Sequence, residues 1–309
     1  MLCIGTTPTV QRTLVFKKLV PDEVNRAIEV DEYASGKSVN VARVAAAIGS
    51  RVLVTGFAGG DRGRFLADEL RHDRVQHDFE PIKGQTRLCT TVIDRTADTV
   101  TELVEEHAAV TRSDLHRLLR RCQKHMISRK CGVVVLSGSL PPGADPSFYR
   151  RVIEIAHSHK LRVLLDARGE PLQRALPIGG FIAKFNRAEL AETVRDPLRT
   201  ETAFKKAMWQ VCPADGAICI TMGKHGAAAF DGKNYWQIST PAVRAVNPIG
   251  SGDAFAAGLA SVLERGGSFA EGCKLGSACG AANAMTARAG VVDPAVVQRL
   301  QTRVKVSKW

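Results

Sequence analysis

Hydrophobic residues along the later part of the chain follow two alternating spacings. From residue 111 onward, short β-rich runs such as Val133–Leu136 and Ile218–Ile220 alternate with stretches that have the 3.6-residue spacing of amphipathic helices. Polar residues suited to helix starts stand before two of those stretches, at Asp145-Pro146 and at Thr200. Such alternation predicts an α/β fold, with a mostly parallel sheet covered by helices on both faces.

Two earlier stretches depart from this alternation. Residues 12–34 and 86–104 have the pattern of strand pairs with no helix between the strands. They contain too little core to be stable alone, so we expect a small sheet that projects from the main domain. With 309 residues, the chain is long enough to bury a large core. We therefore expect one α/β domain over 1–309 with this appendage.

Composition excludes some classes of function. No stretch reaches the apolar length of a membrane span, and the N-terminus lacks the basic start and hydrophobic run of a signal peptide. We expect a cytoplasmic protein without a membrane partner. The formal net charge is +12, but the basic residues are scattered, which argues against a nucleic-acid partner. Part of the positive excess is better assigned to anionic small molecules.

The segment Asn247–Phe255 contains the candidate chemistry. Gly250 and Gly252 flank Ser251, and the acid Asp253 opens an almost wholly apolar helical run. Glycines allow a ligand close to the backbone, and the first N–H groups of a helix lack intrahelical partners, so a phosphoryl group fits there. Asp253 would repel a resting phosphate and is better suited to accept a proton. A simple tight turn with a helix cap has the same composition and stays an alternative.

A second motif lies far upstream, in Ser35–Arg43 followed by Ala45–Gly49. Together with the Asn247–Phe255 segment it resembles the paired signatures of the ribokinase-like sugar kinases, the PfkB family. The resemblance implies a three-layer α/β/α fold with a mostly parallel central sheet. It also implies that the small sheet is a lid over the sugar, and that the lids of two protomers meet in a homodimer. The upstream motif would lie at the sugar and the downstream motif at the transferred phosphoryl group.

Several segments resemble the phosphosugar branch of this family. Ser137–Gly143 is similar to its Ser-Gly-Ser-Leu-Pro-x-Gly loop, in which Ser139 would donate to a phosphate already on the substrate. The resemblance implies that Arg87 in the lid clamps the same phosphate and that Arg26 assists. A lid arginine that is only a surface residue is the alternative for Arg26. In the upstream motif, the resemblance implies that Gly36 and Asn40 contact the sugar hydroxyls and that Lys37 lies near the phosphate of the sugar.

One position departs from the family pattern. Members that act on phosphosugars usually carry an Asn-Pro-Ala-x-Asp segment whose Asp grips sugar hydroxyls, whereas this chain has Thr7-Pro8-Thr9-Val10-Gln11. Gln11 can donate and accept hydrogen bonds but supplies no charged acceptor. This difference concerns the identity of the sugar.

The nucleotide site is implied by two further segments. Lys184–Leu190 resembles a Lys-Pro-Asn-x-x-Glu-Leu segment, with Phe185 in place of Pro. There, Lys184 would approach the nucleotide phosphates, and Asn186 and Glu189 would organise Mg²⁺ through water. Residues 221–226 match a Ser/Thr-x-Gly-x-x-Gly segment. The residues implied beside ATP are Thr221, Gly223 and Gly226 under the phosphates and ribose, and Ala281, Ala282 and Asn283 at the adenine, where a helix packed with small residues is the alternative.

These features predict an ATP- and Mg²⁺-dependent kinase of a ketohexose phosphate, of the fructose 1-phosphate or tagatose 6-phosphate type. Asp253 would act as general base while the amides of Gly250, Ser251 and Gly252 hold the γ-phosphoryl group. A potassium requirement is left open. Two alternatives also remain open, a kinase of an unphosphorylated sugar or nucleoside and a non-catalytic sensor of a sugar phosphate or nucleotide. The motif Asp166–Glu170 matches the same branch and is interpreted as mainly structural.

Overall fold

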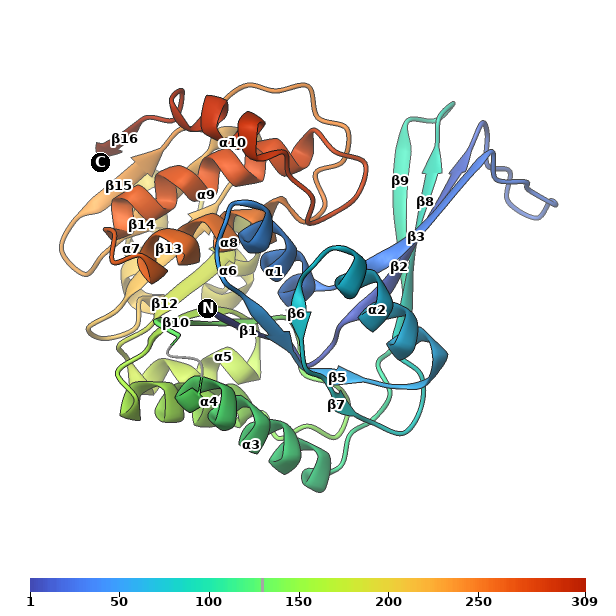
Figure 1. Ribbon diagram of the computed structural model, residues 1–309. Helices are drawn as coiled ribbons and strands as arrows, with labels where there is room; N and C mark the ends of the chain where they lie inside the picture. The colour runs from blue at the N-terminus through green and yellow to red at the C-terminus, as the bar shows by residue number, and fades with distance from the viewer. Residues whose placement is uncertain (129–130) are drawn as a thin grey trace.

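A ten-stranded sheet runs through the centre of the molecule (Figure 1). The computed structural model describes residues 1–128 and 131–309. Neighbouring strands are parallel from β6 to β13, whereas β14, β15 and β16 continue the sheet in antiparallel pairs. In spatial order the strands are β16 (Val306–Lys308), β15 (Tyr235–Ile238), β14 (Ala227–Phe230), β13 (Ala217–Thr221), β12 (Ile182–Asn186), β11 (Arg162–Asp166), β10 (Val133–Ser137), β1 (Leu2–Ile4), β4 (Leu53–Thr55) and β6 (Gln76–His77).

Polar side chains end four adjacent parallel strands of this sheet. Ser137 pairs in register with Asp166, and Asn186 pairs with Thr221. The residues before them in the strands are mostly buried and apolar, because both faces of the sheet are covered. Since the carboxyl ends of parallel strands meet at one edge, these polar groups share the edge at which open α/β sheets bind ligands.

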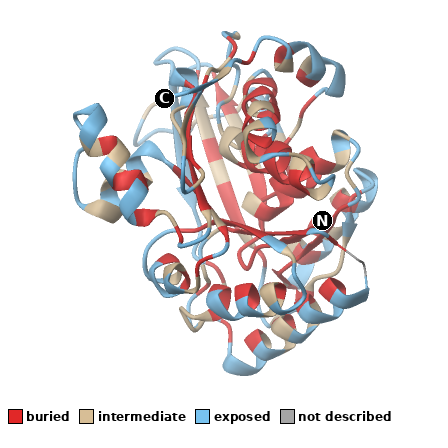
Figure 2. Ribbon diagram, turned by 90° about the vertical axis from the view of Figure 1, so that its left-hand side faces the viewer, coloured by how far each residue is buried: buried red, intermediate tan, exposed pale blue. Residues whose placement is uncertain are grey.

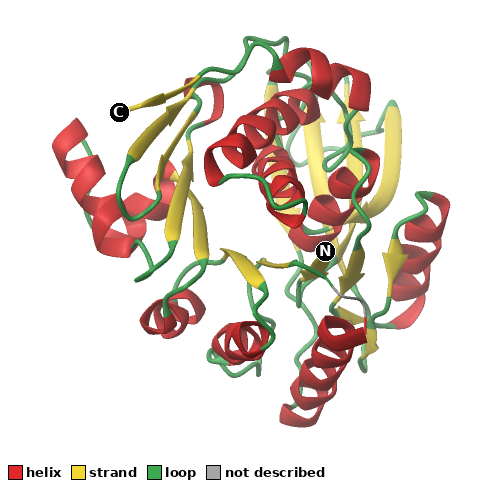
Figure 3. Cartoon of the chain, turned by 60° about the vertical axis from the view of Figure 1, so that its left-hand side comes forward, coloured by secondary structure: helices red, strands yellow, loops and turns green. Residues whose placement is uncertain are grey.

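Helices cover both faces of the sheet in three layers, as the sequence pattern predicts (Figure 3). Figure 2 shows that the buried parts of these helices are mainly those turned toward the sheet. One face is covered by α1 (Lys37–Ala47), α2 (Gly60–His72), α8 (Ser251–Glu264), α9 (Phe269–Ala284) and α10 (Pro294–Gln301), and the other by α3 (Arg112–Ser128), α4 (Phe148–Ser158), α5 (Glu170–Ala175), α6 (Arg187–Val194) and α7 (Glu201–Val211).

Helix α8 is buried along most of its length. Every residue from Asp253 to Ser261 is buried, in agreement with its almost wholly apolar sequence. It packs closely on α9, since a Cβ on Gly258 would lie 2.8 Å from the Cα of Gly276. Backbones in such close contact cannot shift independently, so the N-terminus of α8 has a fixed place at the sheet edge.

A smaller sheet of four strands projects from the body (Figure 1). Its order is β3-β2-β8-β9, with β2 and β8 parallel and the two outer pairs antiparallel. The sequence pattern located these strand pairs, although β2 begins three residues earlier than the expected lid boundary. The lid strands are β2 (Thr9–Phe16), β3 (Glu29–Ser35), β8 (Arg87–Asp94) and β9 (Thr99–Val104), and the short remaining elements are β5 (Phe57–Ala58), β7 (Glu80–Pro81), η1 (Leu176–Ile178) and η2 (Gly223–His225).

The helix starts agree with the sequence pattern at one site and differ at another. Thr200 caps α7, because its side chain accepts a hydrogen bond from the amide of Ala203. In contrast, α4 begins at Phe148 and not at Asp145-Pro146. The side chain of Asp145 accepts from the amide of Ser147, and its carbonyl accepts from Phe148, so these residues form a turn before the helix.

In the described ranges, no helix combines the length and the apolar character that a membrane span requires.

Candidate active site

The N-terminus of α8 is shaped by two glycines. Gly250 has a φ of 81°, which favours glycine, and a Cβ there would lie 3.0 Å from the Cβ of Ala289. A Cβ on Gly252 would lie 2.9 Å from Nζ of Lys184, so this ammonium group stands directly beside the first turn of the helix. The amide of Ser251 donates to the carbonyl of Pro248 at 3.2 Å. A helix N-terminus and a lysine therefore face the same space, an arrangement that attracts anions.

Asp253 lies in the first turn of α8 and is only 7% exposed. Its Oδ2 accepts a hydrogen bond of 2.8 Å from Nδ2 of Asn40, and Oδ1 of Asn40 accepts one from Ser35. Burial and the nearby charge of Asp166 raise the pKa of Asp253 to about 6, although lysines and the Asn40 bond act in the opposite direction. A carboxylate in this state is suited to proton transfer near neutral pH.

Asp166 joins two lysines at the end of β11. Its Oδ1 pairs with Nζ of Lys37 at 2.6 Å, and its Oδ2 pairs with Nζ of Lys184 at 2.5 Å. Burial alone would raise the pKa of Asp166, but the two lysines lower it to about 2. Sequence reasoning treated Asp166 as mainly structural and missed this role. The available signal was a carboxylate that ends a buried parallel strand.

Lys37 is turned toward this carboxylate. Burial would lower its pKa, but the charges of Asp166 and Asp253 raise it above the usual value, so Lys37 remains a cation. Its Nζ also lies 3.8 Å from Oε1 of Glu189. The predicted contact between Lys37 and a sugar phosphate would thus compete with its ion pair to Asp166. Lys184 forms an ion pair with the same carboxylate and also faces the α8 terminus.

Asn186 and Glu189 form a capping box at the start of α6. Asn186 Oδ1 accepts from the amide of Glu189, and Glu189 Oε2 accepts from the amide of Asn186, both at 2.8 Å. Oε1 of Glu189 is not used in this box. In the part of the chain that the structure describes, no cluster of three or more His, Cys, Asp or Glu residues is arranged to hold a metal. The donors present suit a hydrated Mg²⁺ that a nucleotide carries, since Mg²⁺ usually keeps several waters.

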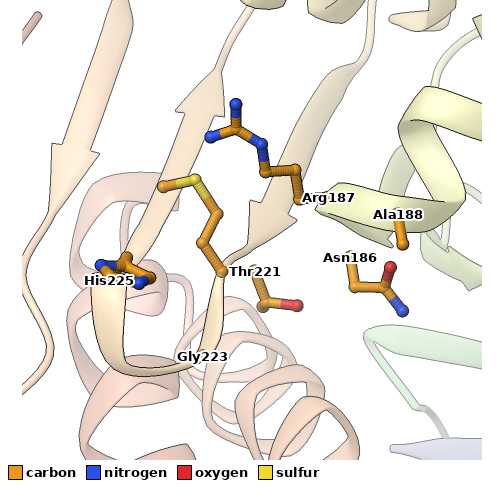
Figure 4. A pocket seen from close by; sticks show the side chains of 7 residues that line it. Asn186, Arg187, Ala188, Thr221, Gly223 and His225 are labelled. Carbon is orange, nitrogen blue, oxygen red and sulfur yellow. The ribbon is translucent and has the colours of Figure 1, made fainter. Parts of the chain in front are cut away.

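A pocket of about 320 Å³ opens beside these residues (Figure 4). It lies between the ends of β12 and β13, because Asn186 pairs in register with Thr221. Phe185 is fully buried in β12 and continues the strand, so the Pro-to-Phe difference leaves Asn186 at the strand end. Gly226, which directly precedes β14, has a φ of 87° and no room for a side chain. The pocket is lined by Asn186, Arg187, Ala188, Thr221, Met222, Gly223 and His225.

Asn283 is fully buried and supports the glycine-rich loop. Its Nδ2 donates to the carbonyl of Ile249 at 2.8 Å and to Oγ of Ser251, and its Oδ1 accepts from the amide of Gly290. The predicted contact of this side chain with adenine conflicts with these bonds, because its polar atoms are already used. Ala281 and Ala282 are also buried in α9.

Arg87 and Ser139 meet around Thr7. Arg87 Nη2 donates to the carbonyl of Thr7 at 3.2 Å, and the Thr7 hydroxyl donates to the carbonyl of Ser139. Nε of Arg87 is buried and has no hydrogen-bond partner among the described residues. Gly36 packs against the same segment, since a Cβ there would lie 3.0 Å from the Cα of Pro8. The lid and the end of β10 thus bring two predicted phosphate ligands together.

Gln11 and Arg26 are placed differently from these ligands. Gln11 is 6% exposed, pairs in register with Tyr33 and Cys89, and donates from Nε2 to the hydroxyl of Thr91 at 2.8 Å. Arg26 is exposed in the segment between β2 and β3 and forms no ion pair within the described residues. Within the described residues, neither side chain forms a hydrogen bond with Arg87 or Ser139.

A family comparison covers the stretch that contains the glycine-rich terminus, the buried acid and the lysines. The model described as "pfkB family carbohydrate kinase" matches residues 1–294. The chain belongs to the pfkB family of carbohydrate kinases. Its sheet, helix layers and added small sheet agree with the ribokinase-like fold of solved members of this family.

Solved structures that resemble this pfkB-family chain extend over nearly its whole length. Phosphofructokinase-2 from Escherichia coli, in complex with potassium, has a TM-score of 0.90 and 24% identity, with 98% of each chain covered. A possible 1-phosphofructokinase from Thermotoga maritima has a TM-score of 0.88 and 22% identity, with 100% and 99% covered. Arabidopsis thaliana ribokinase, complexed with ribose and ATP, has a TM-score of 0.77 and 20% identity, with 97% and 98% covered. Other structures of the E. coli enzyme are described as a complex with fructose-6-phosphate and as a tetrameric inhibited form.

Proposed function

We propose that this carbohydrate kinase transfers the γ-phosphoryl group of ATP to a ketohexose phosphate. The observation that supports it most strongly is Asp253, a buried carboxylate with a pKa of about 6 at the glycine-rich start of α8. Phosphate binding alone requires no buried acid at that point, whereas a reaction with a hydroxyl group requires a proton acceptor.

Asp253 takes the proton of the attacking hydroxyl group in the proposed reaction. The hydroxyl oxygen forms a bond to the γ-phosphorus, the bond from that phosphorus to the β-γ bridging oxygen breaks, and ADP leaves. Asn40 holds Oδ2 of Asp253, which keeps Oδ1 available for the proton. The first amides of α8 and the ammonium of Lys184 stabilise the negative charge of the transferring group.

ATP occupies the pocket at the ends of β12 and β13 in this proposal. Asn186, Thr221 and Gly223 line it. Val246 is 64% exposed and its amide donates to the carbonyl of Ala284, so an exposed apolar side chain stands near the end of α9. In this proposal the purine base packs against it. Mg²⁺ bound with the nucleotide would neutralise phosphate charge, and Asn186 and Glu189 are the residues that would hold its waters. A requirement for potassium stays a prediction.

Arg87 and Ser139 bind the phosphate that the sugar already carries. The support for this assignment is the buried Nε of Arg87, which lacks a partner, because a buried unpaired donor is costly unless a ligand satisfies it. Gln11 lies in the same lid, and in this proposal a bond to a sugar hydroxyl would replace its bond to Thr91. Fructose 1-phosphate and tagatose 6-phosphate remain the candidate substrates.

A homodimer through the lid is the proposed assembly. The lid, residues 12–34 and 86–104, exposes apolar side chains that a monomer has no reason to leave in water. Val24 is 83% exposed, for example. The surrounding lid residues include Arg26, which the same contact would bring near a second protomer. The exposed large apolar residues of the lid are Leu19, Val24, Ile28, Val30, Val100, Leu103 and Val104.

A panel of acceptors tests the proposed activity directly. ADP release is measured with fructose 1-phosphate, fructose 6-phosphate, tagatose 6-phosphate, fructose, ribose and adenosine, with Asp253→Asn as the blank. Turnover restricted to the phosphorylated ketohexoses supports the proposal. Turnover of only unphosphorylated acceptors indicates a sugar or nucleoside kinase. Binding of a sugar phosphate without any turnover indicates a sensor.

A further inference from the structure

Arg288, in the segment after α9, forms an ion pair with the lid. Its Nε lies 2.7 Å from Oδ2 of Asp31 and its Nη2 lies 2.5 Å from Oδ1, a bidentate arrangement. The guanidinium carbon also stands 5.1 Å from the ring centroid of Tyr33, within the range of a cation–π interaction. Asp31 and Tyr33 belong to β3, so Arg288 contacts one lid strand at two points.

The residue after Arg288 strengthens this contact with the lid. The amide of Ala289 donates to the hydroxyl of Tyr33 at 3.2 Å, and both residues are almost fully buried. Burial raises the pKa of Tyr33 above its usual value, although the hydrogen bond from Ala289 acts in the opposite direction, so Tyr33 stays neutral. The bond therefore persists across the physiological pH range.

The same segment packs against the catalytic loop on its other side. A Cβ on Gly250 would lie 3.0 Å from the Cβ of Ala289, and a Cβ on Gly290 would lie 2.7 Å from the Cα of Asn40. The amide of Gly290 also donates to Asn283, which holds the loop carbonyl of Ile249. Ala289 and Gly290 are thus buried with no free space between lid strand β3 and the groups that surround Asp253, whereas Arg288 lies at the surface.

We propose that Arg288 is a positioning residue that couples the lid to the phosphoryl-transfer loop. It holds β3 through Asp31 and Tyr33, so that movement of the lid over a sugar is transmitted through Ala289 to Gly250. The proposal rests on the proposed function for the roles of the lid and the loop. Closely packed segments transmit small shifts, because neither side has space to absorb them.

The ion pair contributes little to stability. Arg288 and Asp31 are 44% and 40% exposed, and exposed ion pairs are typically worth about 0–1 kcal/mol. Removing the guanidinium should leave the fold intact. Arg95 offers a matched control, because it pairs with Glu29 on the same lid strand at 2.6 Å and is similarly exposed. Arg95 forms no hydrogen bond with residues 284–293 in the described chain.

The test compares Arg288→Ala, Arg288→Lys and Arg95→Ala. We expect Arg288→Ala to lower kcat about 10- to 100-fold, since small misplacements of reacting groups cost that much, while the Kd of ATP alone changes less than about 3-fold. Arg288→Lys restores part of kcat, because it keeps the charge but not the bidentate geometry. Arg95→Ala behaves as wild type. Melting temperatures of all three variants stay close to that of the wild type.

Hydrogen exchange provides a readout that does not require turnover. Addition of ATP should slow amide exchange in Glu29–Ser35 of the wild type and of Arg95→Ala, but not of Arg288→Ala. Equal kcat values and equal exchange changes in Arg288→Ala and Arg95→Ala overturn the coupling. If ATP does not change amide exchange in Glu29–Ser35 of the wild type, the coupling is also overturned. If the wild type phosphorylates no acceptor but shows the exchange effect, the proposed function fails while the coupling stands.

Discussion

Asn40 and Asp253 are joined by a hydrogen bond of 2.8 Å, although 213 positions separate them in the sequence. Asn40 comes from the motif at the start of α1, and Asp253 from the motif at the start of α8. Oδ1 of Asp253 has no partner within the described residues, so Asn40 orients the carboxylate and leaves one oxygen available. The two sequence signatures of the family therefore meet in a single contact at the proposed base.

Asp253→Asn should abolish most of the turnover. The substitution removes the proton acceptor and keeps the size of the side chain, so we expect kcat to fall about 10²- to 10⁴-fold. The Kd of ATP, measured by calorimetry, should change less than about 3-fold. A variant with nearly wild-type kcat on the true substrate contradicts the assignment of Asp253 as base.

The same substitution should stabilise the fold above pH 6. Burial raises the pKa of Asp253 from 3.8 to about 6, so the folded protein binds more protons than the unfolded chain between these values. Stability then falls as pH rises through this range, by about 3 kcal/mol in total. Urea unfolding should give Asp253→Asn a higher free energy of unfolding at pH 8 and little advantage at pH 4. An equal advantage at both values would mean that another effect dominates.

Asp166→Asn should move the acid limb of the pH profile. The proposed base works only when ionised, so kcat/KM of the wild type should fall as pH drops through about 6. The negative charge of Asp166 raises the pKa of Asp253. In the variant this charge is absent, whereas the positive charges of Lys37 and Lys184 remain and lower the pKa of Asp253. We expect the limb to shift to lower pH even if the rate is reduced. A limb that stays in place or moves upward argues against this electrostatic link.

Arg87→Ala should weaken sugar phosphate binding selectively. A charge-assisted contact is lost on the sugar side only, so we expect KM for the sugar phosphate to rise about 10- to 100-fold, with KM for ATP changed less than about 3-fold. Arg62→Ala is a suitable control, because Arg62 is half-buried like Arg87 and pairs with Glu105. Similar increases in both KM values for Arg87→Ala point to a general structural role.

Gln11→Asp tests how the sugar hydroxyls are recognised. A charged acceptor forms stronger hydrogen bonds, so kcat/KM on fructose 1-phosphate or tagatose 6-phosphate should rise, by about 10-fold. The variant should melt at a lower temperature, because it buries a charge and loses the bond from Gln11 to Thr91. Lower activity on every sugar phosphate would show that Gln11 suits a substrate outside this set.

The sequence by itself indicated the alternation of strands and helices, the two strand pairs of the small sheet and the cap of α7 at Thr200. These features depend on local spacing and on hydrogen bonds between near neighbours, as between Thr200 and Ala203. The glycines around Asp253 were also recognisable, because a tight turn before an apolar helix has few compatible residues. The capping box of Asn186 and Glu189 also lies within four consecutive residues, although the sequence analysis interpreted these two residues only as organising Mg²⁺.

Only the tertiary structure decided which charged groups meet. Asp166 lies 129 positions from Lys37, and Arg288 lies 257 positions from Asp31. Their pairing follows from which strands are neighbours in the sheet and from where the segment after α9 crosses the lid. The pKa values of Asp166 and Asp253 depend in turn on burial and on these partners. Local spacing carries no information about such contacts, because they arise only when distant segments pack together.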